Sequence, residues 1–598
     1  MSSQDAETWP LEAGHFAKPL EQLRHGEPWK EVLEELLLDL PEERADRLMQ
    51  LMREARGAWL PLAHVRAGRA LVVGNALSGT CVPLARAGFR VIVLDTSLPR
   101  LALARFRDQA LAAGRVLALC ADAGASLPFA DMSFDLVAQE DRLPRSEPDW
   151  RRGLDELRRV CRGELMLSAD NRFGYKRSSG RRGRFLIPSP LQFLRAGIHP
   201  RAGERSLRGY RKLLRSPGFS EPRAFSLYPH SREFTHLVAL DAELPRLVLG
   251  PKERANRLKL LGHRLGLFPW LTPSFGLFGA RSQAALDSPR LDRVLAELAR
   301  RIDEEQPQAE QVLATRGNSI VVQTRLAGGD PDEPRGRWTL HVPLSPQQQR
   351  LLETHHARLD LISARMPGVP VPAGLFLGEI EGLFLGCERR LGGLTGPHLS
   401  GDQECARNTF SDAARQTAAW ITQPARPLDE ADFERLIGTR FDLVASKAAV
   451  EATRSNLRRL REESAELLIG RSFPRVLYHA DLRSKHVQMR PDGHVIGYLD
   501  WGPSETDDLP YYDLLHLICH ERKQEADLRA EEAWAIVREG ERLRDYERAA
   551  LEDYAGRLGL DPLYCRAIER IYPVLVAATV ERNWDYSRPR WLHREFGL

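Results

Sequence analysis

Hydrophobic residues in the first third of the chain follow two different periodicities. Between residues 27 and 56 they recur at helical spacing on both sides of Pro41, which predicts two packed helices. Farther along, short apolar runs alternate with helical stretches, and the runs span residues 69–74, 89–95, 116–122, 134–139 and 164–170. Strands that alternate with helices form βαβ units, so this region is predicted to be an α/β fold with a parallel sheet.

The second half of the chain has a different pattern. Two segments with β-type alternation, 318–326 and 337–344, lie on either side of a loop rich in Gly, Pro and Asp and predict antiparallel strands. A helical pattern follows at 344–363, and most of the sequence after it is helical apart from a hairpin that turns at 492–493. This order predicts a small lobe rich in strands and a larger helical lobe.

Length and composition agree with a folded protein of at least two domains. The chain has 598 residues, too many for one hydrophobic core, and 28% of them are charged. The first residues form no secretory signal, no run of 18 apolar residues occurs, and the seven Cys form no CxxC pair. We therefore expect a cytoplasmic protein with reduced thiols.

Small and acidic residues stand where the predicted parallel strands end. Gly74 and Gly79 flank the first turn from strand to helix, where the backbone can approach a ligand. Asp95 ends the second strand, and its spacing from Gly74 is that of a carboxylate that accepts both ribose hydroxyls of a nucleoside. Asp122 ends the third strand. Each Asp alone would also suit a helix cap, but together they predict a nucleoside site at this edge of the sheet.

Four segments in this order resemble the successive motifs of class I S-adenosylmethionine-dependent methyltransferases: VVGNALSGT, VIVLDTS, CADAGASLPFADMSFDLV and ELRRVCRGELMLS. The resemblance covers about residues 65–170 and extends by continuity to about residue 283. It implies a Rossmann-like sheet that binds S-adenosylmethionine. The residues implied in cofactor binding are Gly74, Asn75, Gly79, Asp95, Thr96, Asp122 and Ala123.

Two positions depart from the methyltransferase pattern. Val72 stands where the family usually has an acidic residue, and Ala76 replaces the second Gly of the turn. Val72 removes a polar contact to the methionine end of the cofactor, while the methyl group of Ala76 narrows the turn. A degenerate methyltransferase therefore stays an alternative, whereas the lack of a GxGxxG motif argues against NAD.

Residues 172–215 form a basic insertion after the last of these strands. The segment holds 13 Lys or Arg residues and one acid, Glu204. It is either a solvated surface or an electropositive rim that attracts an anionic substrate or the acidic headgroups of a membrane surface. Its aromatic residues belong to no recognised RNA-binding motif, so nucleic acid is the less favoured partner.

The stretch LYHADLRSKHVQMRPDGHVIGYLDWG, residues 477–502, combines the two carboxylates that phosphoryl transfer needs. One carboxylate accepts the proton of the attacking hydroxyl, and another holds a divalent cation on the nucleotide phosphates. Asp481 suits the first role and Asp500 the second. Together with His479 and Asp513, these residues resemble the aminoglycoside-phosphotransferase or choline-kinase-like family over about residues 310–598.

This second resemblance implies a two-lobed, protein-kinase-like (α+β) domain that uses ATP with Mg²⁺ or Mn²⁺. His486 occupies the position of the family's metal-binding Asn, so the implied metal ligands are His486 and Asp500. His341 occupies the position of the phosphate-binding Lys, and the small lobe contains no Lys. The position of its partner carboxylate falls near Glu353, His355 or His356, and the family spacing favours His355. The implied nucleotide-binding residues are Gly317, Asn318, His341 and Glu388. These replacements leave a pseudokinase as the alternative.

The chain is thus predicted to contain an N-terminal helical segment (1–64), a methyltransferase domain (65–283), a helical linker (284–309) and a kinase-like domain (310–598) with lobes at about 310–396 and 397–598. Two such catalysts in one chain predict a bifunctional transferase. Bacterial methyltransferase–kinase fusions that cap cell-surface polysaccharides are a similar pairing, so the acceptor is expected to be a hydroxyl-bearing small molecule or a glycan, free or lipid-linked, in polysaccharide or natural-product biosynthesis. The alternatives are an active methyltransferase with a non-catalytic pseudokinase domain and an RNA-modifying methyltransferase.

Overall fold

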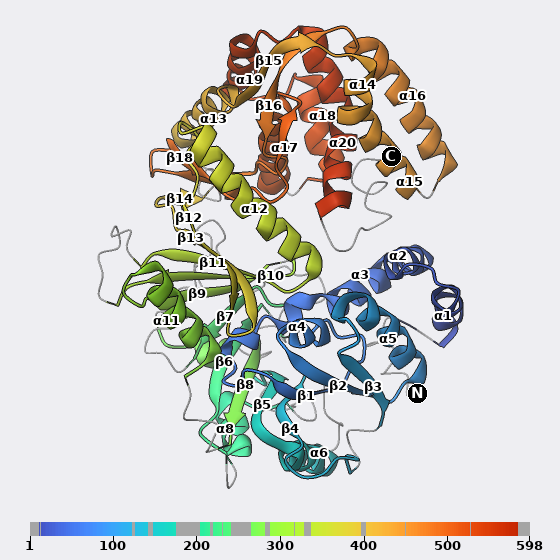
Figure 1. The fold of residues 1–598 in the computed structure, drawn as a ribbon, viewed down its shortest axis with the longest axis vertical. Helices are drawn as coiled ribbons and strands as arrows, with labels where there is room; N and C mark the ends of the chain where they lie inside the picture. Colours follow the sequence, from blue (N-terminus) through green and yellow to red (C-terminus); the bar gives the residue numbers. More distant parts are fainter. Residues whose placement is uncertain are drawn as a thin grey trace, which may run out of the picture. The chain divides into compact units, whose positions relative to one another are not determined.

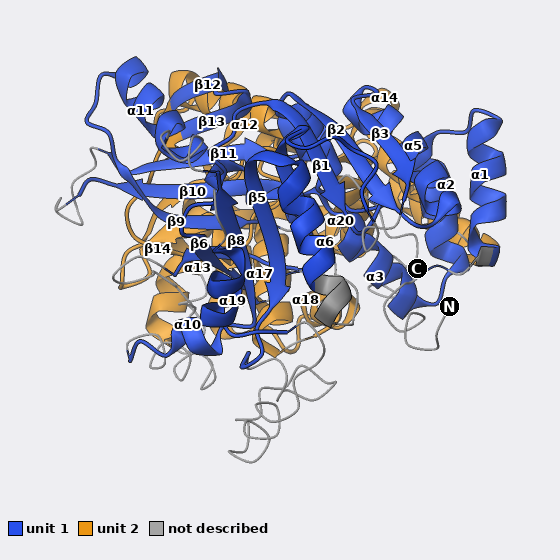
Figure 2. Ribbon diagram, turned by 90° about the horizontal axis from the view of Figure 1, so that it is seen from below, with its two compact units in different colours: residues 1–349, 375–387 blue, residues 350–374, 388–598 orange. Residues whose placement is uncertain are grey.

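The computed structural model describes residue 11 and residues 13–583, except for 122–125, 141–146, 175–203, 216–218, 230, 232, 241–264, 282–287, 316, 328–335, 396–401, 449 and 527. The chain forms two compact units (Figures 1 and 2). Unit 1 contains Met1–Gln349 and Leu375–Cys387, and unit 2 contains Arg350–Gly374 and Glu388–Leu598.

Unit 1 begins with helices that lead into its sheet. Helices α2 (Trp29–Asp39) and α3 (Glu42–Met52) confirm the pair of helices predicted on both sides of Pro41, and a shorter helix α1 (Ala17–Arg24) precedes them. Two buried 3₁₀ turns, η2 (Glu54–Gly57) and η3 (Leu60–Leu62), connect α3 to the first strand.

The first strands of unit 1 pair in parallel in the order β3-β2-β1-β4-β5. In chain order the elements are β1 (Gly68–Val73), α4 (Cys81–Arg86), β2 (Phe89–Asp95), α5 (Leu98–Ala112), β3 (Val116–Cys120), β4 (Phe134–Gln139), α6 (Glu147–Val160) and β5 (Cys161–Asp170). Helices α4 and α5 lie on one face of these strands and α6 on the other (Figure 1). The five strands predicted from the apolar runs, and their parallel arrangement, are confirmed.

Antiparallel strands extend this sheet beyond β5. Strand β8 (Ser274–Ala280) pairs with β5 and with β6 (Arg223–Tyr228), and β6 pairs with β7 (His236–Ala239). Two short helices accompany them, α8 (Leu207–Leu214) and α10 (Phe268–Leu271). Side chains from both helices join the hydrophobic core that also contains α6 and β5.

The sheet does not end at β7, because β7 pairs with β9 (Gln308–Ala314) through the registers His236↔Leu313 and Leu237↔Val312. The remaining strands follow in the order β9-β10-β11-β13-β12, so the described part of unit 1 contains one sheet of 13 strands. These later elements are α11 (Arg290–Ile302), β10 (Ser319–Arg325), β11 (Trp338–Pro343), β12 (Gly374–Ile380) and β13 (Leu383–Arg389). The strands predicted for a separate small lobe therefore belong to the same sheet as β1–β8, and residue 310, the predicted boundary, lies inside β9.

Unit 2 is mostly helical, with two sheets of three strands each, β14-β17-β18 and β15-β16-β19. Its elements are α12 (Pro346–Arg365), β14 (Leu394–Thr395), α13 (Gln403–Ala418), β15 (Ile421–Pro427), α14 (Glu430–Phe433), η7 (Glu434–Gly438), α15 (Thr439–Lys447), α16 (Glu451–Leu468), β16 (Ser472–Tyr478), η8 (Ser484–His486), β17 (Val487–Met489), β18 (Val495–Tyr498), β19 (Glu505–Asp508), α17 (Tyr512–Ala526), α18 (Ala530–Glu539), α19 (Asp545–Leu558) and α20 (Pro562–Asn583). The predicted hairpin is β17–β18, and its turn needs Gly493, where φ is +89° and a Cβ would lie 2.2 Å from the carbonyl oxygen of Cys405.

Two expectations about the whole chain can be compared with the structure. All seven cysteines are free, as predicted from their spacing. Within the described ranges, no helix combines the length and the apolar composition that a membrane crossing requires.

The β7–β9 pairing generates a prediction about stability. The Ala314 N–H donates to the Thr235 carbonyl oxygen at 2.9 Å, and Ala314 is buried. We expect Ala314→Pro to lower the free energy of unfolding by about 1–3 kcal/mol, because it removes this donor and leaves a buried carbonyl unpaired. Hydrogen exchange should show lost protection on both sides of the junction, in β7 and in β10. Ala314→Ser keeps the N–H and is the control; equal stability and exchange for the two variants would contradict the prediction.

Candidate functional site

Residues at the carboxyl ends of β1 and β2 form the first candidate site. Gly74 follows β1 with φ of +126°, a conformation that side chains disfavour, so this turn needs glycine. The Asn75 side chain is buried, and its Oδ1 accepts a hydrogen bond from the Leu77 N–H at 2.9 Å. The exposed Thr96 follows Asp95 at the end of β2. The predicted residues Asp122 and Ala123 lie outside the described residues.

The Asp95 carboxylate is buried and fully engaged by the protein. Its Oδ2 accepts from the Ala76 N–H at 3.0 Å, and its Oδ1 accepts from the Ser97 N–H at 2.9 Å. The Arg100 guanidinium binds both oxygens, with Nε 2.9 Å from Oδ2 and 3.1 Å from Oδ1. Hydroxyl groups of a ribose could therefore reach this carboxylate only by displacing Arg100.

Gly79 packs against the backbone of the N-terminal segment. A Cβ at this position would lie 1.9 Å from the Arg53 carbonyl oxygen, and the Gly79 N–H donates to the Leu51 carbonyl at 3.0 Å. The close approach that this glycine permits is thus to the end of α3. The assignment of Gly79 to cofactor binding stays a prediction.

The structure adds Glu140, directly after β4, to the residues at this edge. Its carboxylate is buried and accepts short hydrogen bonds from the hydroxyls of Ser78 and Thr80, and Arg56 Nη2 lies 3.4 Å from Oε2. Sequence reasoning missed this group, although an acid directly after a buried strand is the same signal that drew attention to Asp95. The buried network Ser78–Glu140–Arg56 ties the first turn to β4 and η2.

Three of the predicted nucleotide-binding residues lie in unit 1, two of them in the β9–β10 turn and one on β11. Asn318 is buried with φ of +58°, and its Oδ1 accepts from the Ala55 N–H at 3.3 Å. Gly317 is its neighbour in the β9–β10 turn, and the half-buried His341 pairs across β11 and β10 with Val321. The turn is thus anchored to η2 of the same unit. A phosphate-binding role for these residues stays a prediction.

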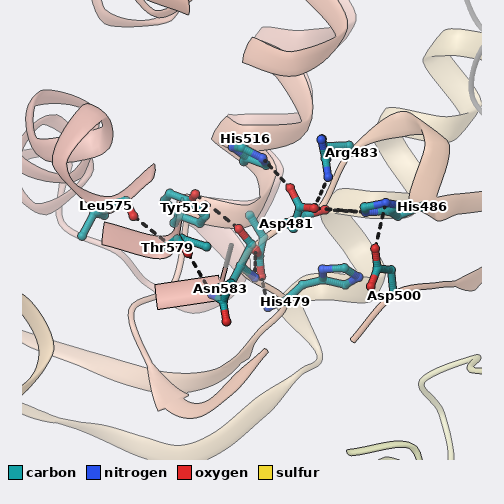
Figure 3. A network of polar contacts seen from close by, with 12 residues as sticks. His479, Asp481, Arg483, His486, Asp500, Tyr512, His516, Leu575, Thr579 and Asn583 are labelled. Atoms are coloured by element: carbon teal, nitrogen blue, oxygen red, sulfur yellow. Dashed lines mark hydrogen bonds and ion pairs between the residues drawn. The ribbon is translucent and has the colours of Figure 1, made fainter. Parts of the chain in front are cut away.

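The second candidate site lies in unit 2, around Asp481 (Figure 3). Asp481 is buried, its Oδ2 forms a short ion pair with Arg483, and its Oδ1 lies 3.3 Å from His516 Nε2. Because a carboxylate only accepts, Nε2 carries the proton, and His516 Nδ1 can accept from the Tyr572 hydroxyl at 2.9 Å. Burial raises the pKa of Asp481, but the charge of Arg483 and the His516 hydrogen bond outweigh burial and hold the pKa well below its usual value. Asp481 is therefore ionised.

A second buried carboxylate holds the backbone of this loop. Asp513, at the start of α17, accepts from the N–H groups of His479 and Ala480 at 2.7 and 3.0 Å. Ala480 has φ of +69°, a strained conformation that such bonds can maintain. Burial raises the pKa of Asp513 to about 7, even though the two backbone hydrogen bonds favour its charged form.

The geometry of His486 fixes its tautomer. His486 Nδ1 lies 2.7 Å from the Asp481 carbonyl oxygen, which can only accept, so Nδ1 carries the proton. Burial lowers the pKa of His486, so the ring is neutral and its Nε2 has a free lone pair. This nitrogen lies 3.3 Å from Asp500 Oδ2. A cation could bind between these two atoms, because each presents a lone pair.

Asp481, His486 and Asp500 together bring one ligand atom each within 4.8 Å of one another. Their environments separate their roles, because the Asp481 oxygens are held by Arg483 and His516, whereas the Asp500 side chain is 56% exposed and has φ of +64°. The structure thus brings the predicted catalytic and metal-binding residues together in one place. The roles of these residues stay predictions.

His355 connects α12 to the residue after Asp500. Its Nδ1 accepts from the Trp501 N–H at 3.0 Å, so its Nε2 carries the proton and donates to Glu388 at 2.8 Å. Glu388, predicted to bind nucleotide, is thus already paired with His355. The position predicted for the partner of the family's Lys is occupied by a neutral ring that orients the Asp500–Trp501 backbone.

Sequence reasoning missed Arg100, Arg483 and His516. His516 had a usable signal, because it follows Asp513 by three residues on α17 and therefore lies on the same helix face. Arg100 and Arg483 follow their aspartates by five and two residues, and a polar stretch of sequence does not show which of its arginines will pair.

Two parts of the chain match models of known protein families. Residues 71–164 match the family model described as a methyltransferase domain, and residues 330–551 match that of the phosphotransferase enzyme family. Both are transferase families, so the chain carries two transferase domains, one on a Rossmann-like parallel sheet and one kinase-like. A search of curated proteins found no match.

Solved structures of both kinds are similar to parts of the chain. Magnesium protoporphyrin IX methyltransferase from Synechocystis, with bound S-adenosylhomocysteine, is 17% identical over 44% of this chain and 95% of its own, with a TM-score of 0.25. Macrolide 2′-phosphotransferase type I is 17% identical over 51% of this chain and 94% of its own, with a TM-score of 0.33. An ADP-bound aminoglycoside phosphotransferase is 14% identical over 47% and 99%, with a TM-score of 0.28.

The Asp95–Arg100 pair generates a prediction about cofactor binding. We expect Arg100→Ala to bind S-adenosylmethionine about tenfold or more tightly than the wild type in isothermal titration, because the cofactor no longer competes with a charge-assisted bond of about 1.5–3 kcal/mol. The free variant should also melt at a lower temperature, since a buried carboxylate loses its cation.

Two further variants serve as controls for this experiment. Arg105→Ala removes an exposed Arg from the same helix and should leave affinity unchanged, and Asp95→Ala should abolish binding. Weaker binding by Arg100→Ala than by the wild type would show that Arg100 contacts the cofactor instead of competing with it.

Proposed function

Because the chain joins a methyltransferase domain to a phosphotransferase-family domain, we propose that it transfers a methyl group from S-adenosylmethionine and a phosphoryl group from ATP. The acceptor is a hydroxyl-bearing small molecule or a glycan, free or lipid-linked, in cell-surface polysaccharide or natural-product biosynthesis. The use of ATP agrees with the cytoplasmic location expected from the sequence.

The observation that carries the phosphotransferase proposal is the difference in environment between Asp481, whose oxygens are held by Arg483 and His516, and the neighbouring His486–Asp500 pair. Asp481 is ionised and buried, so it orients the acceptor hydroxyl and accepts its proton as the oxygen attacks the γ-phosphorus of ATP. The bond between the γ-phosphorus and the bridging oxygen breaks, ADP leaves, and the phosphate ester forms. To receive the hydroxyl, Asp481 has to exchange its contact with Arg483 or His516 for one with the acceptor.

His486 and Asp500 fit a divalent cation, because Nε2 and Oδ2 present lone pairs to each other at 3.3 Å. A bound cation would neutralise charge on the nucleotide phosphates. Mg²⁺ prefers oxygen ligands, whereas an imidazole nitrogen suits Mn²⁺ better. The ligand set therefore favours Mn²⁺.

For methyl transfer, the proposed cofactor residues are those at the ends of β1 and β2. Once Arg100 moves away, the Asp95 carboxylate has lone pairs for the two ribose hydroxyls, and the Gly74 turn leaves the backbone open. S-adenosylmethionine supplies an electrophilic methyl group, and S-adenosylhomocysteine leaves as the acceptor loses its proton. Glu140, Ser78 and Thr80 stabilise the turn that the cofactor would contact.

A non-catalytic kinase-like domain is the second candidate. It is favoured by the lack of any Lys in the small-lobe sequence and by the Asn318 side chain, which anchors the β9–β10 turn to Ala55. The third candidate, an RNA-modifying methyltransferase, relies on the basic residues 172–215. It predicts RNA binding that weakens with salt and with charge reversal in that segment.

The metal pair generates a prediction about turnover. We expect ATP hydrolysis or transfer to be faster with Mn²⁺ than with Mg²⁺, and His486→Asn to reverse this preference by replacing the imidazole with an amide oxygen. Steady-state rates with each metal provide the measurement. His494→Asn changes an exposed His of the same hairpin that pairs with Asp412, and it should leave the preference unchanged. Nucleotide binding without turnover in either metal, unrestored by His486→Asn, would establish the pseudokinase.

Asp481 provides a separate prediction. Asp481→Asn should lower kcat at least about a hundredfold, because the amide cannot accept the acceptor's proton. ATP affinity should change little, since this carboxylate acts on the acceptor. Asp492→Asn, at the exposed hairpin turn, serves as the control. Full turnover by Asp481→Asn would move the general base to another residue.

The acceptor can be identified independently of these variants. Surface glycans and small metabolites from cells with and without the gene should differ by the mass of one methyl group and one phosphoryl group. A difference of only one kind would assign activity to one domain alone.

A further inference from the structure

The loop that precedes β8 in unit 1 exposes large apolar side chains. Leu265, Leu267 and Trp270 are 64%, 45% and 56% exposed, and they lie within six residues of one another in sequence. Isolated apolar residues are common on protein surfaces, but a cluster that includes Trp marks an interaction site.

The backbone of this loop is held firmly. Phe268, between the exposed residues, is buried in the core of unit 1, and its ring lies 6.5 Å from that of Tyr228. The Asn171 side-chain amide donates to the carbonyl oxygens of Trp270 and Thr272 at 2.8 and 2.7 Å. Trp270 is therefore exposed although its backbone is held in place by hydrogen bonds. Figure 2 shows α10 at the rim of unit 1.

Helix α8 is the second component of this surface. Tyr210 and Leu214 are buried, while Arg208, Lys212 and Arg215 are exposed at positions i, i+4 and i+7. This spacing places the three cations on one helix face, opposite the buried pair. Of the three, Arg215 is paired with Glu221.

The two components flank the same segment of backbone. Asn171 forms a bridge with Arg205, directly before α8, and the Arg172 N–H donates to the Arg205 carbonyl at 3.1 Å. On its other side Asn171 donates to the loop at Trp270. Since Phe268, Tyr210 and Leu214 enter one core cluster, the exposed side chains of both elements point away from that core.

We propose that this surface, formed by Arg208, Lys212, Leu265, Leu267 and Trp270, docks unit 1 on an anionic membrane. Trp and Leu enter the boundary between headgroups and acyl chains, where an amphipathic ring is favoured, and the basic helix face pairs with the anionic headgroups. The charge of α8 selects this occupant over a second copy of the chain, which would bring the same cations to the interface. A protein bound in this way lies at the membrane interface and does not span the hydrocarbon core.

The docking surface lies beside the proposed reaction edge of the sheet. Asn171 directly follows Asp170 at the carboxyl end of β5, and β5 runs parallel to β4 and β1. A membrane-bound acceptor would thus be presented at the edge that holds Gly74 and Asp95. This orientation rests on the proposed function, whereas binding to vesicles does not.

Co-sedimentation of the full chain with vesicles tests the proposal without either transfer reaction. We expect binding to vesicles of phosphatidylcholine and phosphatidylglycerol at low salt, weak binding to phosphatidylcholine alone, and release at high salt. Arg208→Glu with Lys212→Glu should weaken binding at least about twentyfold, since each cation near an anionic surface contributes about fivefold. Trp270→Ser should weaken it about tenfold.

Matched variants control for general effects. Leu563→Ser removes another exposed apolar side chain and Arg407→Glu reverses another exposed cation, and both should bind as the wild type does. Thermal unfolding checks that each variant is folded. Wild type that stays in solution with anionic vesicles at low salt, or equal binding by all variants, would overturn the proposal. So would a dimer in sedimentation velocity that Trp270→Ser converts to monomer, because the surface would then join two copies of the chain.

Discussion

The backbone pairing between β7 and β9 determines how the chain is organised. A sheet that ended at β7 would leave an edge of unpaired N–H and C=O groups, and β9 would leave another. Their pairing removes both edges and makes a single sheet of 13 strands. Because Asn318 in the β9–β10 turn also binds Ala55, the strands of the predicted small lobe are fixed to the N-terminal helices of unit 1. The segment that matches the methyltransferase model and the segment that matches the phosphotransferase model therefore both contribute strands to this sheet.

Elements that depend on neighbouring residues in the sequence could be predicted, whereas pairings between residues far apart in the sequence could not. Strands β1, β2, β4 and β5 are largely buried apolar runs, and β3 is an apolar run at the edge of the sheet. The sequence signal for such runs is local, so the positions of all five strands were predicted. The β7–β9 pair depends on contacts between residues that are far apart in sequence, such as His236 and Leu313, and no local pattern shows them. The start predicted for the kinase-like domain, residue 310, therefore falls inside β9.

The sites show the same limit. Motif spacing alone predicted that Asp481, His486 and Asp500 share one site, since their loops are close in sequence. It gave no sign that Arg100 would bind both oxygens of Asp95, because the sequence does not show which arginine will pair with a given carboxylate. The tautomers of His486 and His355 could not be predicted from the sequence either, since each depends on one backbone group, the Asp481 carbonyl or the Trp501 N–H.

Both proposed functional carboxylates are paired with an arginine close in sequence, Asp95 with Arg100 and Asp481 with Arg483. Burial raises the pKa of Asp481, but the charge of Arg483 and the His516 hydrogen bond hold it well below its usual value, so this carboxylate stays an acceptor. The same contact opposes the ligand, which has to replace a charge-assisted bond of about 1.5–3 kcal/mol. A ligand can do so if it supplies its own donors, as ribose hydroxyls or an acceptor hydroxyl would. The guanidinium released from Asp481 would then be free to face the negative charge of the transferring phosphoryl group, in a chain whose small lobe has no lysine for that role.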